Sequence, residues 1–265
     1  MYRSTLFVPC ANARAMAKAK DLACDALIFD LEDAVGPEER DGALAALVAA
    51  LTAGGFIAKH VLVRIHPGSF NAIHRALQGV AFDGLVVPKV GGTEDLRGIM
   101  MAWPKVALWA MIETAEGAAN LWEIAGLPLK GLIAGPNDLR QSLRTRPMPA
   151  RQDILFALSQ VVLYGRANGL AVLDGVYNQY TDETGFAAEC EQGRSLGFDG
   201  KTLIHPSQIE AANRAFSPSE AEVEWATAVV AAFEGKAGGV VPMSGEMVER
   251  LHLAQAQAIL AVTGD

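Results

Sequence analysis

The sequence predicts an α/β fold, a (β/α)8 barrel of the TIM type in which helices surround eight parallel strands. Eight short apolar runs rich in β-branched residues recur along the chain, and most precede a segment with helical periodicity. The runs are almost continuously apolar, which is typical of parallel strands buried on both faces. The length of 265 residues suits a single barrel domain.

The expected elements alternate regularly along the chain. The predicted strands are Thr5–Pro9, Ala26–Leu31, Val61–Ile65, Gly84–Pro88, Val106–Ile112, Gly131–Ala134, Ala171–Gly175 and Lys201–Ile204. The predicted helices are Arg14–Leu22, Glu38–Leu51, Phe70–Leu77, Glu94–Met101, Ala115–Ile124, Arg151–Asn168, Gly185–Leu196 and Pro206–Phe216. We therefore expect the barrel to occupy residues 1–216 and residues 217–265 to form a C-terminal helical extension of the same domain.

Composition narrows the class of protein. The net charge of −8 argues against a nucleic-acid surface, because phosphate binding needs clustered Lys and Arg. Cys10, Cys24 and Cys190 are odd in number and widely spaced, which fits neither a disulfide framework nor a thiolate metal cage. The first residues do not resemble a signal peptide, and the Ala-rich stretch 42–58 is interrupted by polar residues and glycines. We expect a soluble cytoplasmic protein without a membrane segment.

Acidic residues follow two neighbouring predicted strands, at the end of the barrel where active sites of this fold lie. Glu113 directly follows the fifth strand, and Asp138 lies shortly after the sixth. Mg²⁺ is commonly bound by one or two carboxylates together with waters and substrate oxygens. The alternative is that each acid only caps the next helix, as we expect for His205 before Pro206. The pair predicts a magnesium site.

Further charged residues follow other predicted strands. Arg64 ends the third strand, Lys89 follows the fourth, and Glu32 and Asp33 follow the second. A fixed guanidinium beside a metal would hold a carboxylate or stabilise a developing enolate oxygen. The alternative for Arg64 is a structural ion pair with Asp30, Glu32 or Asp33. The alternative for Lys89 is an ion pair with Glu32 and Asp33.

Seven strings, in order over nearly the whole chain, carry a resemblance. They are Arg3–Pro9, Asp25–Val35, Val63–Ile65, Val87–Val90, Met111–Thr114, Gly197–Lys201 and Ile204–Ile209. Together they resemble the citrate lyase β-subunit family, in the acyl-CoA lyase branch of the metal-dependent aldolase and citrate lyase superfamily. The resemblance implies a magnesium-dependent barrel that cleaves or forms a carbon–carbon bond beside an acyl thioester. Related enzymes include citryl-, malyl- and citramalyl-CoA lyases and thioesterases of such acids.

The resemblance also implies roles for individual residues. Glu113 and Asp138 would bind Mg²⁺, and Arg64 would bind the substrate and stabilise the enolate. Glu32 and Asp33 would order water bound to the metal and so contribute to catalysis.

Four further residues complete the predicted site. Pro136, Asn137 and Lys89 are expected to contact the substrate. The string that ends in Glu249 resembles a family motif whose Asp acts as acid and base in several relatives. Glu249 is therefore a candidate catalytic acid or base, although its side chain is one methylene longer. The alternative is an exposed residue of the C-terminal helix.

The resemblance predicts a magnesium-dependent lyase that acts on a 3-hydroxy-dicarboxyl or tricarboxyl acyl thioester. The products would be a 2-keto acid and an acyl thioester, formed through an enolate. Expected partners are an acyl-CoA or acyl-carrier substrate and copies of the same chain, as a trimer. Residues 133–139 also resemble metal-dependent aldolases that add pyruvate to aldehydes. Further alternatives are an acyl-CoA thioesterase and a non-catalytic subunit of a lyase assembly.

Overall fold

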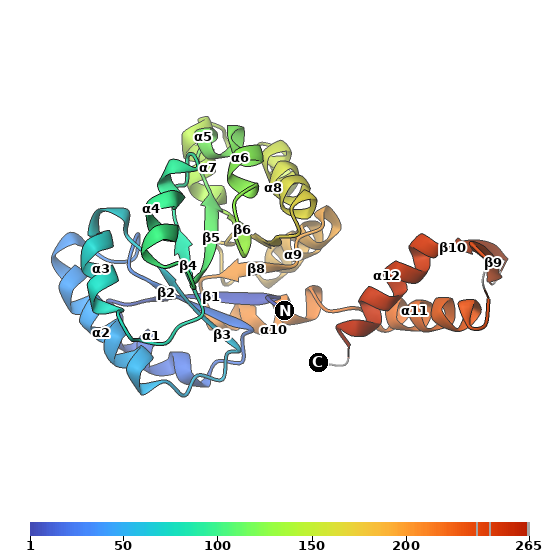
Figure 1. The fold of residues 1–265 in the computed structure, drawn as a ribbon, viewed down its shortest axis with the longest axis horizontal. Helices are drawn as coiled ribbons and strands as arrows, with labels where there is room; N and C mark the ends of the chain where they lie inside the picture. The colour runs from blue at the N-terminus through green and yellow to red at the C-terminus, as the bar shows by residue number, and fades with distance from the viewer. Residues whose placement is uncertain (237, 244, 264–265) are drawn as a thin grey trace. The chain divides into compact units, whose positions relative to one another are not determined.

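A computed structural model describes residues 1–236, 238–243 and 245–263 (Figure 1). The chain divides into two compact units, residues 2–213 and residues 214–265 with Met1. This division lies close to the predicted boundary between residues 216 and 217. That both units belong to one domain stays a prediction.

The larger unit is a closed barrel of eight parallel strands in chain order, which confirms the predicted fold (Figure 1). Pairing of β1 with β8 closes the barrel, with Ser4 opposite Lys201. The strands are β1 Ser4–Pro9, β2 Ala26–Asp30, β3 His60–Arg64, β4 Gly84–Val87, β5 Ala107–Ile112, β6 Gly131–Ala134, β7 Ala171–Asp174 and β8 Gly200–Leu203. Most strand residues are buried, as their continuous hydrophobicity predicts.

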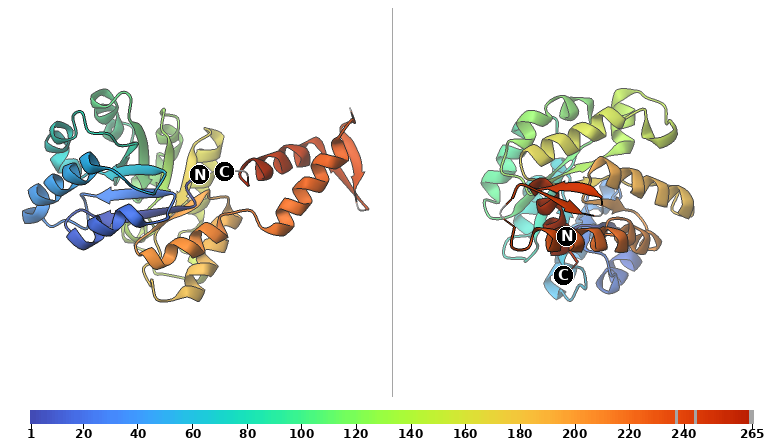
Figure 2. Two further views of the ribbon diagram at one scale, coloured as in Figure 1. Left: turned by 90° about the horizontal axis from the view of Figure 1, so that it is seen from below. Right: turned by 90° about the vertical axis from the view of Figure 1, so that its right-hand side faces the viewer.

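Helices follow the strands and surround them (Figure 2). The α-helices are α1 Ala13–Lys18, α2 Arg40–Ala53, α3 Phe70–Ala76, α4 Glu94–Ala102, α5 Ala115–Ala119, α6 Leu121–Ala125, α7 Pro136–Leu143, α8 Leu155–Ala167, α9 Glu183–Leu196 and α10 Ile209–Ala215. Single turns of 3-10 helix are η1 Ala19–Asp21, η2 Pro37–Glu39, η3 Pro67–Ser69, η4 Pro149–Arg151 and η5 Pro206–Gln208.

Two helical expectations were wrong in detail. The helix predicted over 115–124 is divided at Asn120 into α5 and α6. Helix α7 was not predicted, although Pro136 occupies its first turn, where proline loses no helical hydrogen bond. This short helix carries Asp138 and therefore positions part of the predicted metal site.

The inside of the barrel is filled by large apolar side chains. Trp109 of β5 is fully buried and belongs to a cluster with Met111, Ile133 and residues from other strands. Gly131 on the neighbouring strand leaves room for this indole, because a Cβ there would lie 2.4 Å from the Trp109 ring. A core packed in this way leaves only the strand ends for a binding site.

The C-terminal unit has a core of its own. It contains α11 Glu220–Phe233, β9 Val240–Met243, β10 Glu246–Glu249 and α12 Arg250–Ala261. The two strands pair antiparallel, so the segment expected to be helical also holds a β-ribbon. Val229 and Phe233 of α11 pack with Val241, Val248 and Ala256.

Two expectations about the chain can be compared directly with the structure. Cys10, Cys24 and Cys190 are buried and form no disulfide. Within the described residues, every helix is too short or too polar to cross a bilayer.

Candidate active site

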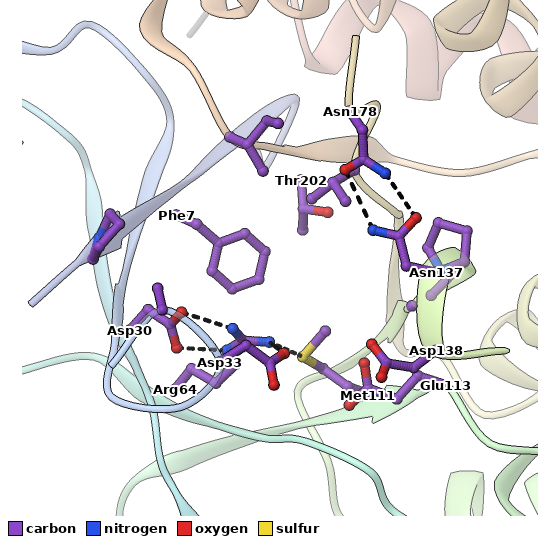
Figure 3. A pocket seen from close by; sticks show the side chains of 17 residues that line it. Phe7, Asp30, Asp33, Arg64, Met111, Glu113, Asn137, Asp138, Asn178 and Thr202 are labelled. Atoms are coloured by element: carbon purple, nitrogen blue, oxygen red, sulfur yellow. Dashed lines mark hydrogen bonds and ion pairs between the residues drawn. The ribbon is translucent and has the colours of Figure 1, made fainter. Parts of the chain in front are cut away.

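A cavity of about 300 Å³ lies in the barrel unit at the carboxyl ends of the strands (Figure 3). Six of the residues predicted as site residues line it. These six are Asp33, Arg64, Glu113, Pro136, Asn137 and Asp138. The structure thus brings residues from four different βα segments to one place, as the barrel prediction required.

Glu113 directly follows β5 and points into this cavity (Figure 3). Glu113 does not cap the next helix. Thr114 is the N-cap instead, and its hydroxyl accepts the Gly117 N–H at 2.9 Å. The Glu113 side chain is buried, with the residue 1% exposed, and its Oε1 accepts the backbone N–H of Lys89 at 2.7 Å. Gly135 makes room for it, since a Cβ there would lie 2.4 Å from the Glu113 Cβ.

The electrostatic surroundings of Glu113 are unfavourable for its charged form. Burial raises the pKa of Glu113 to about 7, the hydrogen bond from Lys89 opposes the rise, and the charge of Asp138 adds to it. Within the described residues, no Lys, Arg or His side chain forms an ion pair with Glu113. A buried carboxylate without a cationic partner is a feature that metal binding would explain.

Asp138 lies in the first turn of α7, next to Glu113 (Figure 3). The residue at the N-cap is Gly135, so Asp138 does not cap the helix either. Its half-buried carboxylate makes no hydrogen bond or ion pair to another described residue. Both carboxylates therefore have oxygens available for a ligand.

The donor set fits magnesium better than zinc. The described residues contain no group of three or more His, Cys, Asp or Glu arranged to hold a metal. A structural zinc site uses four N or S ligands, whereas Mg²⁺ uses one or two carboxylates and keeps waters and substrate oxygens. Glu113 and Asp138 supply such a pair.

Arg64 is fixed by acids on one side of the cavity (Figure 3). Its Nε and Nη2 each donate to Asp30 at 2.7 Å, and its Nη1 lies 3.0 Å from Glu32 Oε2 and 3.2 Å from Asp33 Oδ2. Its guanidinium carbon lies 4.8 Å from the centre of the Phe7 ring. Although burial lowers the pKa of Arg64, the hydrogen bonds and charge of Asp30 raise it overall, so the group stays cationic. The ion pairs proposed as the alternative exist, and the residue also lines the cavity.

Lys89 interacts with Glu113 through its backbone and with Glu32 and Asp33, the acids after β2, through its side chain. Its backbone has φ +52°, the left-handed region, and this conformation accompanies the hydrogen bond from its N–H to Glu113. Its Nζ lies 2.5 Å from Glu32 Oε1 and 3.1 Å from Asp33 Oδ1. Lys89 is not among the residues that line the cavity, so its predicted contact with substrate stays a prediction.

Glu32 and Asp33 differ in exposure and in pKa. Glu32 is buried, and burial raises its pKa despite the nearby Lys89 and Arg64. Asp33 has a half-exposed side chain, and although burial opposes it, the hydrogen bond with Glu32 and the two cations lower its pKa. Only Asp33 of the two lines the cavity.

Asn178 is a cavity residue that the sequence analysis missed. It follows β7, and its side-chain amide forms two hydrogen bonds with that of Asn137, at 2.9 and 3.3 Å (Figure 3). Phe7 and Thr202 also line the cavity and were not predicted. Inspection of polar residues a few positions beyond each strand would have found Asn178, but nothing in the sequence distinguishes Phe7 from a core residue.

Besides Glu32 and Lys89, two more residues singled out in the sequence are not among those that line this cavity. Glu249 ends β10 in the C-terminal unit, has an exposed side chain, and its catalytic role stays a prediction. The His205 ring accepts the backbone N–H of Ser207 at 3.2 Å, so it caps η5 as expected.

Fold and site together define a class of protein, a (β/α)8-barrel enzyme with two acidic side chains beside a fixed arginine in the cavity at the strand ends. Residues 3–206 match the model of the HpcH/HpaI aldolase/citrate lyase family. Residues 151–263 match a family described as C–C bond lyases of the TIM-barrel fold. The chain belongs to the HpcH/HpaI aldolase/citrate lyase family, as the sequence strings predicted.

Individual relatives match almost the whole chain. A (3S)-malyl-CoA thioesterase of Cereibacter sphaeroides is 43% identical over 98% of this chain and 94% of its own length. The citrate lyase subunit beta of Leuconostoc mesenteroides is 32% identical over 97% of this chain and 92% of its own.

Solved structures agree with this assignment. CitE from Mycobacterium tuberculosis, in complex with magnesium, acetoacetate and coenzyme A, has a TM-score of 0.85 at 29% identity. That comparison covers 99% of this chain and 98% of the other. A citrate lyase beta subunit from the same organism, with oxaloacetate and magnesium, has a TM-score of 0.72 at 28% identity and covers 82% of this chain and 97% of its own.

Proposed function

We propose that the chain binds Mg²⁺ through Glu113 and Asp138 and cleaves a 3-hydroxyacyl thioester into a 2-keto acid and a smaller acyl thioester. The observation that carries the proposal is that two carboxylates, which pair with no basic side chain among the described residues, line the same cavity as a buried, charged Arg64. The relatives support the magnesium dependence and the lyase class predicted from the sequence, because solved relatives contain magnesium with oxaloacetate or with acetoacetate and coenzyme A.

The reaction needs the loss of a hydroxyl proton, breakage of the carbon–carbon bond, and protonation of the resulting enolate. Bound magnesium would supply positive charge that lowers the pKa of the hydroxyl group. Arg64 is held in one orientation by Asp30 and stays protonated, so it can donate to the enolate oxygen without reorganising. A preorganised donor of this kind contributes about 10²–10³ to the rate.

Other residues of the chain hold protons and water in place. Glu113 must be ionised to bind the cation. Because its pKa is raised, cation binding should weaken as the pH falls below about 7. Asp33 lines the cavity and is fixed by Arg64 and Lys89, so it can order a water beside the cation. Glu32 supports this arrangement through Lys89. Glu249 stays our candidate for the group that protonates the enolate.

Hydrolysis of the thioester is the second candidate function. The specific observation in its favour is the 43% identity to a (3S)-malyl-CoA thioesterase. Both reactions share the metal site and a thioester oxygen that needs a hydrogen-bond donor, so the cavity geometry suits either. They differ in their products, which allows a direct test.

The test is product analysis with malyl-CoA, citramalyl-CoA and citryl-CoA in the presence of Mg²⁺. A lyase gives a 2-keto acid, detected as its phenylhydrazone, and leaves the thioester intact. A thioesterase releases free thiol and gives no keto acid. Glu113→Ala and metal chelation should abolish either activity. Turnover of pyruvate with an aldehyde, and none of the thioesters, would favour the aldolase alternative.

An absence of turnover with intact Mg²⁺ binding would instead favour a non-catalytic subunit of a lyase assembly. We propose free acyl-CoA as the substrate over an acyl-carrier protein, because CoA is the thiol in the names of several relatives. A homotrimer and a cytoplasmic location are also proposals from the resemblance. Light scattering after gel filtration tests the trimer.

A further inference from the structure

We propose that Asn178, through its paired amide with Asn137, limits the size of the group attached to the keto carbon of the 2-keto acid. The inference rests on the proposed function and adds a residue that determines specificity. Asn178 belongs neither to the carboxylate pair nor to the acids around Arg64.

The first observation is that a second cavity adjoins the site. It has a volume of about 560 Å³ and lies between the loop after β7, the loop after α7, and α9. Asn137, Val176 and Asn178 line this second cavity and also the first, which measures about 300 Å³. These three residues therefore form a wall between the two spaces.

The second observation is how the wall is held. The two side-chain amides exchange hydrogen bonds of 2.9 and 3.3 Å, which connect the first turn of α7 to the loop after β7. Asn137 and Asn178 are both exposed, and their amides form no other side-chain hydrogen bond within the described part of the chain. Removal of one amide takes away both hydrogen bonds and part of the wall at once.

The third observation concerns direction. Asn137 precedes Asp138 in α7, so the wall stands next to the carboxylate pair. Figure 3 shows the amide pair and the Arg64–Asp30 pair on different sides of the cavity. When the thioester half of the substrate is at Arg64 and the keto acid half is at the carboxylates, the remaining group on the keto carbon faces the amides.

The lining of the second cavity indicates what a larger group would meet there. Apolar surface comes from Met148, Val176 and Ala188, and polar groups come from Gln179 and Arg140. Arg140 uses its Nε for Asp153 at 2.7 Å. The space suits an alkyl or carboxyalkyl chain, which in the intact protein is separated from the site by the wall.

The test compares the binding of 2-keto acids of increasing size, by calorimetry with saturating Mg²⁺. The probes are glyoxylate, pyruvate, 2-oxobutyrate and 2-oxoglutarate. The natural chain should bind the smaller acids more tightly than 2-oxobutyrate. In Asn178→Ala, the affinity ratio of 2-oxobutyrate to glyoxylate should rise about tenfold or more, because one methylene in a fitted pocket is worth about 10–200-fold.

Two further variants make the test specific. Ala188→Phe added to Asn178→Ala should reverse the change, because the new ring fills the second cavity. Gln179→Ala is the matched control, since Gln179 lines the second cavity and not the first. Its ratio should equal that of the natural chain. Asn178→Ser replaces Asn178→Ala if the alanine variant unfolds, as judged by circular dichroism.

The outcomes separate this inference from the function on which it rests. An unchanged ratio in the folded Asn178 variant overturns the inference and leaves the proposed function intact. Equal binding of small and large acids by the natural chain also overturns it. Failure of the natural chain to bind any keto acid with Mg²⁺ overturns the proposed function itself.

Discussion

Replacement of Glu113 by Gln should stabilise the metal-free protein at high pH while it abolishes magnesium binding. The buried carboxyl has a pKa of about 7, against 4.5 for the ordinary group, with burial the largest cause. Between these two values the folded state binds more protons than the unfolded state, so stability falls as the pH rises. At about 1.4 kcal/mol per pH unit, ionised Glu113 costs the folded apo-protein about 3 kcal/mol above pH 7.

Urea unfolding in the presence of a chelator measures this cost. From about pH 5 to about pH 8, the natural chain should lose about 2.5 kcal/mol more unfolding free energy than Glu113→Gln. Constant effects of the amide cancel in this comparison, and the glutamine oxygen can still accept the Lys89 N–H. Saturating Mg²⁺ should restore stability at high pH in the natural chain only.

The control for this experiment is Asp138→Asn. It removes a neighbouring charge but leaves Glu113 buried, so most of the pH dependence should remain. Identical pH dependence of the natural chain and Glu113→Gln would refute the reasoning. A Glu113→Gln variant that still bound Mg²⁺ with natural affinity would refute the assignment of the ligand.

Three further predictions concern residues around the carboxylate pair. Arg64→Lys should lower kcat by about 10²–10³, because an ammonium cannot hold Asp30 with two parallel hydrogen bonds and present a fixed donor to the enolate; steady-state kinetics checks this. The unfolding free energy of Lys89→Gly, measured by urea denaturation, should exceed that of Lys89→Ala by about 1 kcal/mol, because alanine is strained at a φ of +52°. Equal unfolding free energies would argue against that conformation. Gly135→Ala should weaken Mg²⁺ binding at least about tenfold by calorimetry, since its Cβ would displace Glu113, and an unchanged affinity would contradict the packing.

The barrel could be predicted from sequence because its strands are encoded locally. Each is a short apolar run followed by a helical segment, and parallel closure in chain order follows from that repetition. Helix α7 was not predicted because it has only eight residues and its sequence after Pro136 is mostly polar. The β-ribbon of β9 and β10 was not predicted because hydrophobic periodicity cannot distinguish such short strands from the ends of helices.

The site was predictable to the extent that its residues lie directly at strand ends. Glu113 and Arg64 belong to this group, and the alternation of strand and loop is enough to place both on one rim. Two properties were not accessible from sequence. Lys89 adopts a left-handed backbone, and Asn178 pairs with an amide from another loop. Both depend on how separate βα loops meet, which requires the tertiary structure.

The balance of acidic and basic side chains at the carboxyl ends of the strands has a consequence for the order in which cation and substrate bind. Five carboxylates lie at the cavity or beside it, and the two cations Arg64 and Lys89 pair with three of them. The five are Asp30, Glu32, Asp33, Glu113 and Asp138. A substrate that carries carboxylate and phosphate groups therefore meets an excess of negative charge, and opposite charges nearby are needed to offset it. We expect the divalent cation to enter first, and the enzyme to become attractive to its anionic substrate only once that cation is in place.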